Sequence, residues 1–315
     1  MKIVIDTHIP FIAEAVRKQW PEVAIFPMKS DEIDAKAVRD ADVLVVRTRT
    51  KINEVLLAGS KVSLVCTATI GFDHIDTAYC EAHGIRWMSC PGCNAQAVCD
   101  YIEEALEEVR GERLEVIGVV GVGHVGSKVA KMAERKGYEV LLNDPPKGIG
   151  VSLDFIEQKC DIITFHVPLD ETTYHLCDAA FLSKCKPGAL IINASRGGVV
   201  DEQALLASGH PFILDTWENE PNINPEVLDH ALLASMHIAG YSVEGKRNAS
   251  QMCLDAIAEQ FSLKPIKIAE LRNDVITTEK KGDSAPGWLN RISDSLKQNP
   301  TAFEALRTVY PLREG

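Results

Sequence analysis

The stretch Leu114–Pro146, LEVIGVVGVGHVGSKVAKMAERKGYEVLLNDPP, decides the fold of this chain. It begins with a nearly continuous apolar run, which is typical of a strand buried on both faces of a parallel sheet. A G-x-G-x-x-G turn follows, with Gly121, Gly123 and Gly126 at its glycine positions. Apolar residues then recur at helical spacing, and a second apolar strand runs into Asp144. The stretch therefore predicts a strand, a glycine turn, a helix and a second strand.

This unit is suited to hold the pyrophosphate of a dinucleotide. The first glycine permits a tight turn, the second permits close approach of the backbone to phosphate, and the third lets the helix pack closely on the strand. Free N–H groups and the positive end of the dipole at the helix N-terminus attract the anion. An ordinary structural glycine turn is the alternative, but the flanking strand, helix and acid favour a nucleotide site.

Asp144 lies where a carboxylate binds the two hydroxyls of an adenosine ribose. Its charge repels a 2′-phosphate, which favours NAD over NADP, and the nearby Lys147 weakens this preference only slightly. We therefore predict NAD as the cofactor. The cofactor contacts predicted in this stretch are Gly121, Gly123, His124, Val125, Gly126 and Asp144, with the side chain of His124 pointing outward.

Composition limits the classes of function. The 315 residues suffice for two domains, and 46% hydrophobic with 25% charged residues is typical of a soluble globular protein. The net charge of −12 argues against nucleic acid or an anionic membrane as a general partner. The chain opens on a strand rather than a signal peptide, and no apolar run reaches the length of a membrane span. Nine scattered cysteines indicate reduced thiols and a cytoplasmic location.

Cys90 and Cys93 form a single C-x-x-C motif around Pro-Gly. A redox or metal site would need a second pair or a nearby histidine cluster, and the sequence offers neither. We interpret the motif as a turn before a helix and predict no metal site.

Residues 1 to about 90 alternate short strands and amphipathic helices, which predicts a separate α/β unit with a parallel sheet. One expected helix, Ile9–Trp20, carries Pro10 in its first turn. No glycine phosphate loop occurs in this part of the chain, so it is not the expected nucleotide site. The expected strands are Lys2–Ile5, Val23–Phe26, Val43–Val46, Leu64–Thr67 and Ile85–Met88.

After Asp144 the alternation continues and completes a second, doubly wound sheet, which is entered by a helix that Asn94 caps. We predict two doubly wound parallel-sheet α/β domains: a Rossmann domain of residues 93–240, inserted in a flavodoxin-like substrate domain of residues 1–92 and 241–268. Residues 269–315 form a short helical C-terminal segment, which we assign to dimerisation. The further strands expected are Asp161–Phe165, Ala189–Asn193, Phe212–Asp215 and Leu232–Ser235.

Three polar residues follow expected strand ends beyond the nucleotide motif: Arg196, Glu220 and His237. The planar fork of an arginine binds both oxygens of a carboxylate. A histidine exchanges protons near neutral pH, and a nearby carboxylate orients its ring. Each residue alone is more often structural, and Glu218 competes with Glu220 for the role of partner. Their common placement at strand ends favours a catalytic site.

The motifs GVGHVG, INASRGGVVDE, DTWENEP and HIAGY resemble, in order, those of the D-isomer-specific 2-hydroxyacid dehydrogenases. The resemblance covers most of residues 1–265. It implies that Arg196 binds the substrate carboxylate and carbonyl oxygen, that His237 is the acid/base, and that Glu220 is its partner. It places Asp215 near the nicotinamide carboxamide. The further cofactor contacts that it implies are Val167, Ala194, Ser195, Asp215 and Gly240.

Closer features, TATIGFDHID, PGCNAQAV and HIAGYSVEGK, are similar to the branch of this family that acts on 4-phospho-D-erythronate. That likeness implies NAD-dependent oxidation to 2-oxo-3-hydroxy-4-phosphobutanoate, a step of pyridoxal 5′-phosphate biosynthesis, by a homodimer. It also implies substrate contacts at Thr48, Thr69 and Tyr241. The basic run VRTRTK adds Arg47 as a candidate phosphate ligand. A solvated loop before a helix capped by Thr50 explains this run equally well.

The chain departs from the pattern of the resembled family in two places, and two alternative functions remain. Val167 replaces a small hydroxyl residue near the cofactor, and the C-terminal segment is shorter than the dimerisation domain of the resembled branch. One alternative is a related dehydrogenase for phosphoglycerate, glycerate or another small 2-hydroxy acid. The other is a regulatory protein that binds NAD without turnover, against which the set of Arg196, Glu220 and His237 argues.

Overall fold

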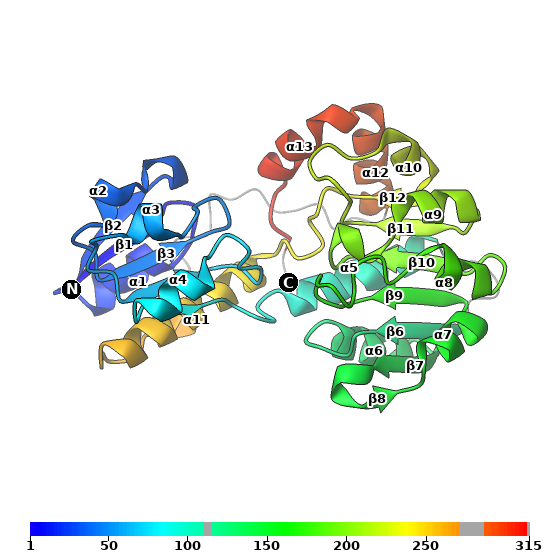
Figure 1. Ribbon diagram of the computed structural model, residues 1–315, viewed down its shortest axis with the longest axis horizontal. Coiled ribbons are helices and arrows are strands. Elements are labelled where there is room, and N and C mark those ends of the chain that lie inside the picture. Colours follow the sequence, from blue (N-terminus) through cyan, green and yellow to red (C-terminus); the bar gives the residue numbers. More distant parts are fainter. Residues whose placement is uncertain (110–114, 271–286, 314–315) are drawn as a thin grey trace. The chain divides into compact units, whose positions relative to one another are not determined.

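The computed structural model describes residues 1–109, 115–270 and 287–313. The chain divides into two compact units (Figure 1). Unit 1 comprises Met1–Asn94 and the chain from Ser242 through helix α11 (Val243–Gln260). Unit 2 comprises Ala95–Tyr241 and the C-terminal helices. Each unit has its own sheet, which confirms the predicted α/β class.

Unit 1 is built on a parallel sheet of five strands in the order β2-β1-β3-β4-β5. This is the flavodoxin-like order, in which ligands bind beyond the carboxyl ends of the strands. Strands β3 and β4 are buried along their whole length, as their continuous apolar sequences predict. The strands are β1 (Lys2–Asp6), β2 (Ala24–Met28), β3 (Val43–Val46), β4 (Leu64–Thr67) and β5 (Arg86–Met88).

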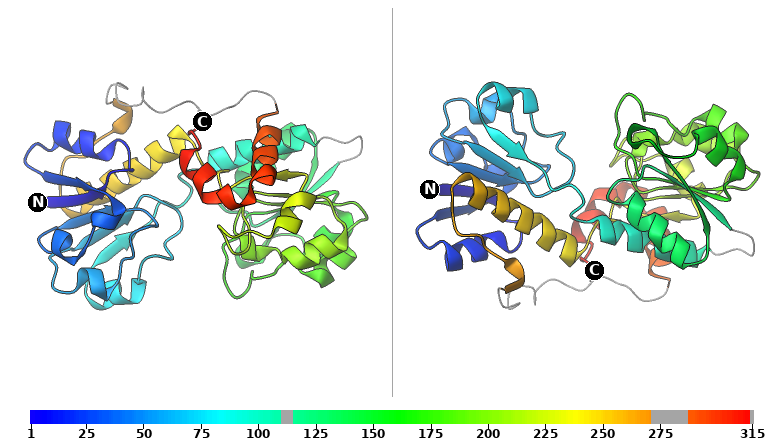
Figure 2. Two further views of the ribbon diagram at one scale, coloured as in Figure 1. Left: turned by 90° about the horizontal axis from the view of Figure 1, so that it is seen from above. Right: turned by 90° about the horizontal axis from the view of Figure 1, so that it is seen from below.

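Helices cover both faces of this sheet. Alternate side chains of β1 point to opposite faces, so that Ile3 and Ile5 join one apolar cluster and Val4 joins another. The first cluster is closed by α1 (Ile12–Gln19) and α11, which pack side by side (Figure 2). The second is closed by the short helices α2 (Ala35–Val38), α3 (Glu54–Leu57) and α4 (Thr77–Ala82).

Two local predictions in this region were wrong, and so was the cap that the alternative interpretation of the basic run assigned to Thr50. Helix α1 begins at Ile12 rather than Ile9, because Phe11 has a φ of 70° and interrupts the helix after Pro10. Helix α3 is capped by Asn53, whose side chain accepts a hydrogen bond from the N–H of Leu56, and not by Thr50. The side-chain oxygen of Asn94 has no hydrogen-bond partner, so it does not cap the next helix.

Unit 2 contains a sheet of seven strands in the order β12-β11-β10-β9-β6-β7-β8. The first six strands of this list are parallel, which gives the Rossmann order around β6 and β9. The prediction missed β8, a two-residue edge strand that pairs antiparallel with β7. The strands are β6 (Val116–Val120), β7 (Glu139–Asp144), β8 (Ile149–Gly150), β9 (Ile162–Phe165), β10 (Leu190–Asn193), β11 (Phe212–Leu214) and β12 (Leu233–Ala234).

The helices of unit 2 enclose one large apolar core. Helices α5 and α6 pack on each other, and α7, α8, α9 and α10 form a consecutive series of neighbours. The helices are α5 (Ala95–Glu108), α6 (Gly126–Arg135), α7 (Leu153–Lys159), α8 (Ala179–Lys184), α9 (Glu202–Ser208) and α10 (Pro225–His230). Within the described residues, no helix combines the length and apolarity that crossing a membrane requires.

The C-terminal helices α12 (Trp288–Gln298) and α13 (Phe303–Val309) extend this core. Trp288 and Phe303 are fully buried among residues of unit 2. Helix α12 packs against β12 and α5, and the hydroxyl of Ser293 accepts a hydrogen bond from the N–H of Ala234 at 3.1 Å. The C-terminal segment is thereby attached to the edge of the Rossmann sheet, next to the last strand.

Candidate active site

The three glycines of the loop between β6 and α6 meet different surroundings. Gly121 has a φ of +89°, and a Cβ there would lie 2.5 Å from the carbonyl oxygen of His166. A Cβ on Gly126 would lie 1.9 Å from the carbonyl oxygen of Gly121. A Cβ on Gly123 would meet only Nζ of Lys147, at 3.9 Å. Packing within the protein therefore demands the first and third glycines, whereas the second leaves open backbone for a ligand.

Asp144 ends β7 beside this loop. Its Oδ2 accepts a hydrogen bond from the N–H of Val122 at 2.9 Å and lies 3.3 Å from Nζ of Lys147. The same Nζ donates to the carbonyl of Val122 at 2.8 Å. The carboxylate is thus held at the glycine loop, with one lysine that partly offsets its charge. His124 is exposed, as predicted, and Val125 precedes the first residue of α6.

The end of β9 approaches the same loop. Val167 lies against Gly121, because its Cγ1 would be 2.8 Å from a Cβ at that position. The ring of His166 is buried, which lowers its pKa to about 3 and keeps it neutral. Its Nε2 is 3.0 Å from Oγ1 of Thr164. An apolar side chain and a neutral imidazole therefore border the glycine loop.

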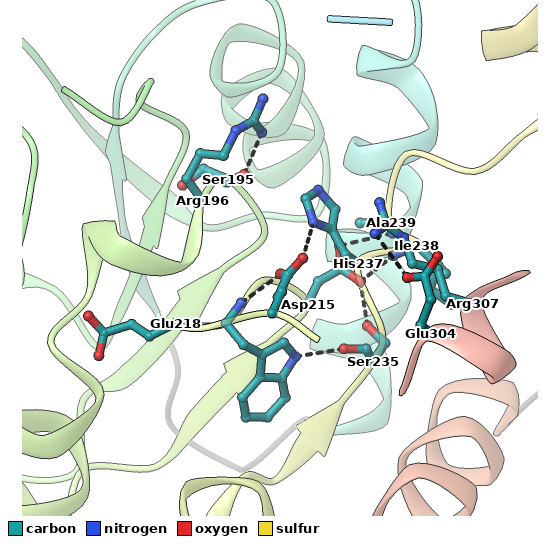
Figure 3. A network of polar contacts seen from close by, with 12 residues as sticks. Ser195, Arg196, Asp215, Glu218, Ser235, His237, Ile238, Ala239, Glu304 and Arg307 are labelled. Carbon is teal, nitrogen blue, oxygen red and sulfur yellow. Dashed lines mark hydrogen bonds and ion pairs between the residues drawn. The ribbon is translucent and has the colours of Figure 1, made fainter. Parts of the chain in front are cut away.

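The candidate catalytic residues follow three neighbouring strands of the same sheet. Arg196 comes after β10, Glu220 after β11 and His237 after β12. Because these strands are parallel and adjacent, their carboxyl ends meet at one edge. Figure 3 shows the guanidinium of Arg196 and the ring of His237 both directed away from the strands.

His237 and Glu220 form a pair. Nδ1 of His237 is 2.9 Å from Oε2 of Glu220, and the other oxygen of Glu220 accepts a hydrogen bond from the N–H of Trp217 at 2.9 Å. Burial alone would raise the pKa of Glu220, but the bond and charge of His237, the Trp217 bond and the Arg307 guanidinium together lower it. Glu220 is therefore an ionised acceptor that fixes the imidazole ring.

Asp215 braces the loop that carries His237. Its buried carboxylate accepts hydrogen bonds from the hydroxyl of Ser235 at 2.6 Å and from the N–H groups of Ile238 and Ala239 at 2.8 and 3.0 Å. His237 has a φ of 58°, which is unfavourable for a residue with a Cβ. The bonds to Asp215 hold this backbone conformation, of the kind found at functional sites.

Asn193, at the end of β10, shapes the loop of Arg196. Its side-chain oxygen accepts hydrogen bonds from the N–H and hydroxyl of Ser195 at 3.0 and 2.7 Å, and its amide donates to the carbonyl of Arg196 at 2.8 Å. Nη1 of Arg196 donates to the carbonyl of Ser195 at 2.7 Å. A Cβ on Gly197 would lie 1.9 Å from the carbonyl oxygen of Trp217, so this glycine permits the close approach of the two loops. Ala194 lies between, half-buried.

Glu218 and Glu220 were both candidates for the partner of His237, and the fold gives them different partners. Oε1 of Glu218 is 2.7 Å from Nε2 of His175, and the N–H of Glu218 donates to Glu202 at 2.7 Å. Figure 3 shows Glu218 turned away from His237. Burial raises the pKa of Glu202 to about 7, to which the charges of Glu218 and Glu220 add. Apart from its place in the first turn of an expected helix, no sequence feature indicated Glu202.

Tyr241 and Gly240 end the loop that begins with His237. The hydroxyl of Tyr241 accepts a hydrogen bond from Nε of Arg307 at 3.2 Å. The buried Arg313 donates to the carbonyls of Tyr241, Ala97 and Ala239. Both arginines come from the C-terminal segment, and sequence reasoning assigned neither of them to the site.

The remaining predicted substrate contacts belong to unit 1. Nε of Arg47 donates to the buried carboxylate of Asp6 at 3.1 Å. Oγ1 of Thr69 is 2.6 Å from Oγ1 of Thr67. Thr48 is exposed and lines a pocket of about 560 Å³ with other polar residues. Arg47, Thr48 and Thr69 follow the carboxyl ends of β3 and β4, where this type of sheet binds ligands.

A Rossmann sheet with a glycine phosphate loop, an acid at the end of the next strand and a histidine–glutamate pair at its edge defines a dinucleotide-dependent dehydrogenase. Residues 99–239 match the NAD-binding domain of the D-isomer specific 2-hydroxyacid dehydrogenases. The chain belongs to this family, because relatives of high identity also align with it over nearly its full length.

These relatives are erythronate-4-phosphate dehydrogenases. The chain is 45% identical to that of Bacteroides fragilis, over 99% of this chain and 97% of the relative. It is 36% identical to that of Pseudomonas putida, over 99% of this chain and 92% of the relative.

Solved structures share the fold. The NAD⁺-bound 3-phosphoglycerate dehydrogenase of Entamoeba histolytica is 26% identical with a TM-score of 0.70, covering 83% of this chain and 95% of that chain. The D-lactate dehydrogenase of Aquifex aeolicus, 23% identical with a TM-score of 0.65, covers 83% and 96%. The latter likeness extends to the fold alone.

Proposed function

We propose that the protein oxidises 4-phospho-D-erythronate to 2-oxo-3-hydroxy-4-phosphobutanoate with NAD, a step of pyridoxal 5′-phosphate biosynthesis. The supporting observation is the His237–Glu220 pair at 2.9 Å, in a chain that aligns from end to end with erythronate-4-phosphate dehydrogenases. The substrate is a small 2-hydroxy acid with two anionic ends, a carboxylate and a phosphate. Each part of the reaction then has a residue suited to it.

His237 is the acid/base. An ionised Glu220 can only accept, so Nδ1 of His237 carries the proton of their hydrogen bond and Nε2 is left with its lone pair. Nε2 takes the proton of the C2 hydroxyl as the C2–H bond breaks. The Glu220 carboxylate stabilises the imidazolium that results, and the braced loop keeps the ring in place.

Arg196 binds the substrate carboxylate with its planar fork and stabilises the negative charge that develops on the carbonyl oxygen. Its loop is fixed by Asn193, so this contact is preorganised. When bound, NAD accepts the hydride that leaves C2. We assign its contacts to the glycine loop, His124, Val125, Asp144, Val167, Ala194, Ser195, Asp215 and Gly240; the open backbone at Gly123 fits such a ligand.

For the phosphate we propose Arg47, with Thr48, Thr69 and Tyr241 as further substrate contacts. We assign cofactor binding to residues 93–240 and substrate binding to residues 1–92 and 241–268. We further propose a cytoplasmic homodimer, which the free state of all nine cysteines and the exposure of Val309 on α13 support. Light scattering of the purified protein tests the dimer.

The test of the reaction is NADH absorbance with 4-phospho-D-erythronate, 3-phosphoglycerate and D-glycerate, with and without a 2-keto acid acceptor. The His237→Gln and Arg196→Gln variants should lose at least about 100-fold in kcat/KM, the range for acid/base and charge-stabilising groups. His175→Gln is the matched control, because it removes a second histidine–glutamate contact of the same unit, at 2.7 Å.

Reduction with 4-phospho-D-erythronate that is far above reduction with the other acids supports the proposal. Preference for another hydroxy acid would keep the mechanism and reject the substrate. NAD binding without turnover of any acid would favour a regulatory protein.

A further inference from the structure

The C-terminal segment brings a cation to the loop that carries the candidate catalytic histidine. Arg307 lies on α13, and its Nε donates a hydrogen bond to the hydroxyl of Tyr241 at 3.2 Å. Tyr241 lies four residues after His237 in the same loop, and Figure 3 shows Arg307 paired with Glu304 beside this network. The side chain is 28% exposed, so a ligand can reach it.

The surroundings of Arg307 indicate a charged rather than an apolar role. The guanidinium lies 3.6 Å from the carboxylate of Glu304 and within electrostatic reach of Glu220. The carboxylates and the contact with Tyr241 outweigh burial and raise the pKa of Arg307. A permanent positive charge is therefore held in hydrogen-bond contact with Tyr241, which is a proposed substrate contact.

The direction of this hydrogen bond decides what Tyr241 can recognise. A guanidinium has only donors, so the bond from Arg307 occupies a lone pair of the tyrosine oxygen. The hydroxyl of Tyr241 keeps its own proton and can act as a donor. An anionic oxygen of the substrate fits both the donor at Tyr241 and the charge at Arg307.

The relatives and the solved structures differ in how much of this chain they cover. The similar solved structures, which include lactate, formate and 3-phosphoglycerate dehydrogenases, cover 82–85% of this chain, although 93–100% of their own length is matched. About a sixth of this chain thus has no counterpart in them. The erythronate-4-phosphate dehydrogenase of Bacteroides fragilis matches 99% of the chain.

We propose that α13 completes the substrate site of its own chain, with Arg307 orienting Tyr241 through their hydrogen bond and supplying positive charge to an anionic group of the substrate. Arg307 is in this sense a specificity-determining residue. The inference rests on the proposed function, because it assumes a phosphorylated 2-hydroxy acid as substrate.

The experiment measures kcat and KM for 4-phospho-D-erythronate in the wild type and in Arg307→Gln, Arg307→Lys, Tyr241→Phe and the Arg307→Gln/Tyr241→Phe double variant. Inhibition by inorganic phosphate and the dissociation constant of NADH are measured alongside. Arg291→Gln is the control, since Arg291 is an exposed arginine on the neighbouring α12.

We expect Arg307→Gln to raise KM about 10- to 100-fold, the range for a lost hydrogen bond to a charged group, with kcat changed less. It should weaken phosphate inhibition and leave NADH binding unchanged. Arg307→Lys should recover part of the loss. The double variant should lose less than the product of the two single losses, because the residues act as a unit.

Three results would overturn the inference: an unchanged KM in Arg307→Gln, undiminished inhibition by phosphate, or a parallel loss of NADH binding that marks general disruption. If Arg307→Gln does not fold, Arg307→Lys and Tyr241→Phe carry the same comparison. Absence of turnover in the wild type would instead reject the proposed function. This outcome differs from a failure of the inference, in which the wild type turns over substrate and Arg307→Gln behaves like it.

Discussion

The buried carboxylate of Asp6 accepts a hydrogen bond from Nε of Arg47 at 3.1 Å, across 41 residues of sequence. The same oxygen accepts from the hydroxyl of Ser30 at 2.6 Å, and the other accepts from the N–H of His8 at 2.9 Å. Burial raises the pKa of Asp6, but these bonds and the charge of Arg47 lower it overall. Asp6 thus fixes Arg47 at the end of the sheet of unit 1.

Replacing this carboxylate should therefore affect both stability and substrate binding. Asp6→Asn removes the charge that pairs with Arg47 and should lower the free energy of unfolding by about 1.5–3 kcal/mol, the range for hydrogen bonds to charged groups. The KM for the phosphorylated substrate should rise, because the guanidinium of Arg47 is released. Urea denaturation and steady-state kinetics measure the two effects.

The matched control is Asp40→Asn, which breaks the exposed pair of Asp40 and Lys61, with side chains 68% and 70% exposed. This change should cost less than about 1 kcal/mol and leave KM unaltered. Because the pKa of Asp6 is lowered in the folded state, its contribution to stability is present above the unfolded pKa and is lost as the pH falls through the folded pKa. Equal effects of the two variants would contradict the assigned role of Asp6.

Sequence reasoning predicted the features that depend on local pattern. Strands Val43–Val46 and Leu64–Thr67 have the predicted bounds, because their apolar runs are closed by polar residues on both sides. The placement of Arg196, Glu220 and His237 at the ends of strands β10, β11 and β12 followed from chain order and from the rule that parallel strands end at one edge.

Features that depend on contacts between distant segments were not predictable in this way. In the sequence Asp6 is marked only by its place after an expected strand, since its partner Arg47 is 41 residues away. Arg307 and Tyr241 are 66 residues apart in the sequence, and the helical pattern of α13 does not predict their contact. The edge strand β8 has two residues, too few for any alternation to be visible.

The glycine loop allows a second prediction, which separates ligand binding from folding. Gly123→Ala adds a methyl group into open space and should leave the free energy of unfolding nearly unchanged while it weakens NAD binding. Gly126→Ala drives its Cβ onto the carbonyl of Gly121 and should destabilise the protein by about 1–3 kcal/mol, as overpacking does. Thermal unfolding and titration of NADH fluorescence measure the two quantities. A Gly123→Ala variant with wild-type NADH affinity would contradict the assignment of this backbone to the cofactor.

The last prediction concerns the buried Glu202, whose carboxylate accepts the N–H of Glu218 at 2.7 Å. Its folded pKa of about 7 lies above the ordinary value of 4.5, so the folded state retains a proton that the unfolded state releases between these pH values. The free energy of unfolding therefore falls as the pH rises through this window, by up to about 3 kcal/mol. Glu202→Gln keeps the acceptor oxygen but cannot ionise. It should be more stable than the wild type at pH 8 and nearly equal to it at pH 5.

Urea denaturation between pH 5 and pH 8 checks this difference, with Glu134→Gln on the exposed face of α6 as the control. The control should follow the pH dependence of the wild type, because an exposed carboxylate titrates similarly in both states. Parallel curves for Glu202→Gln and the wild type would show that Glu202 is already ionised in the folded protein. In the predicted case Glu202 is neutral below pH 7 and accepts a hydrogen bond from Glu218, in the loop that carries Glu220. The candidate catalytic pair is then supported without a second negative charge from Glu202.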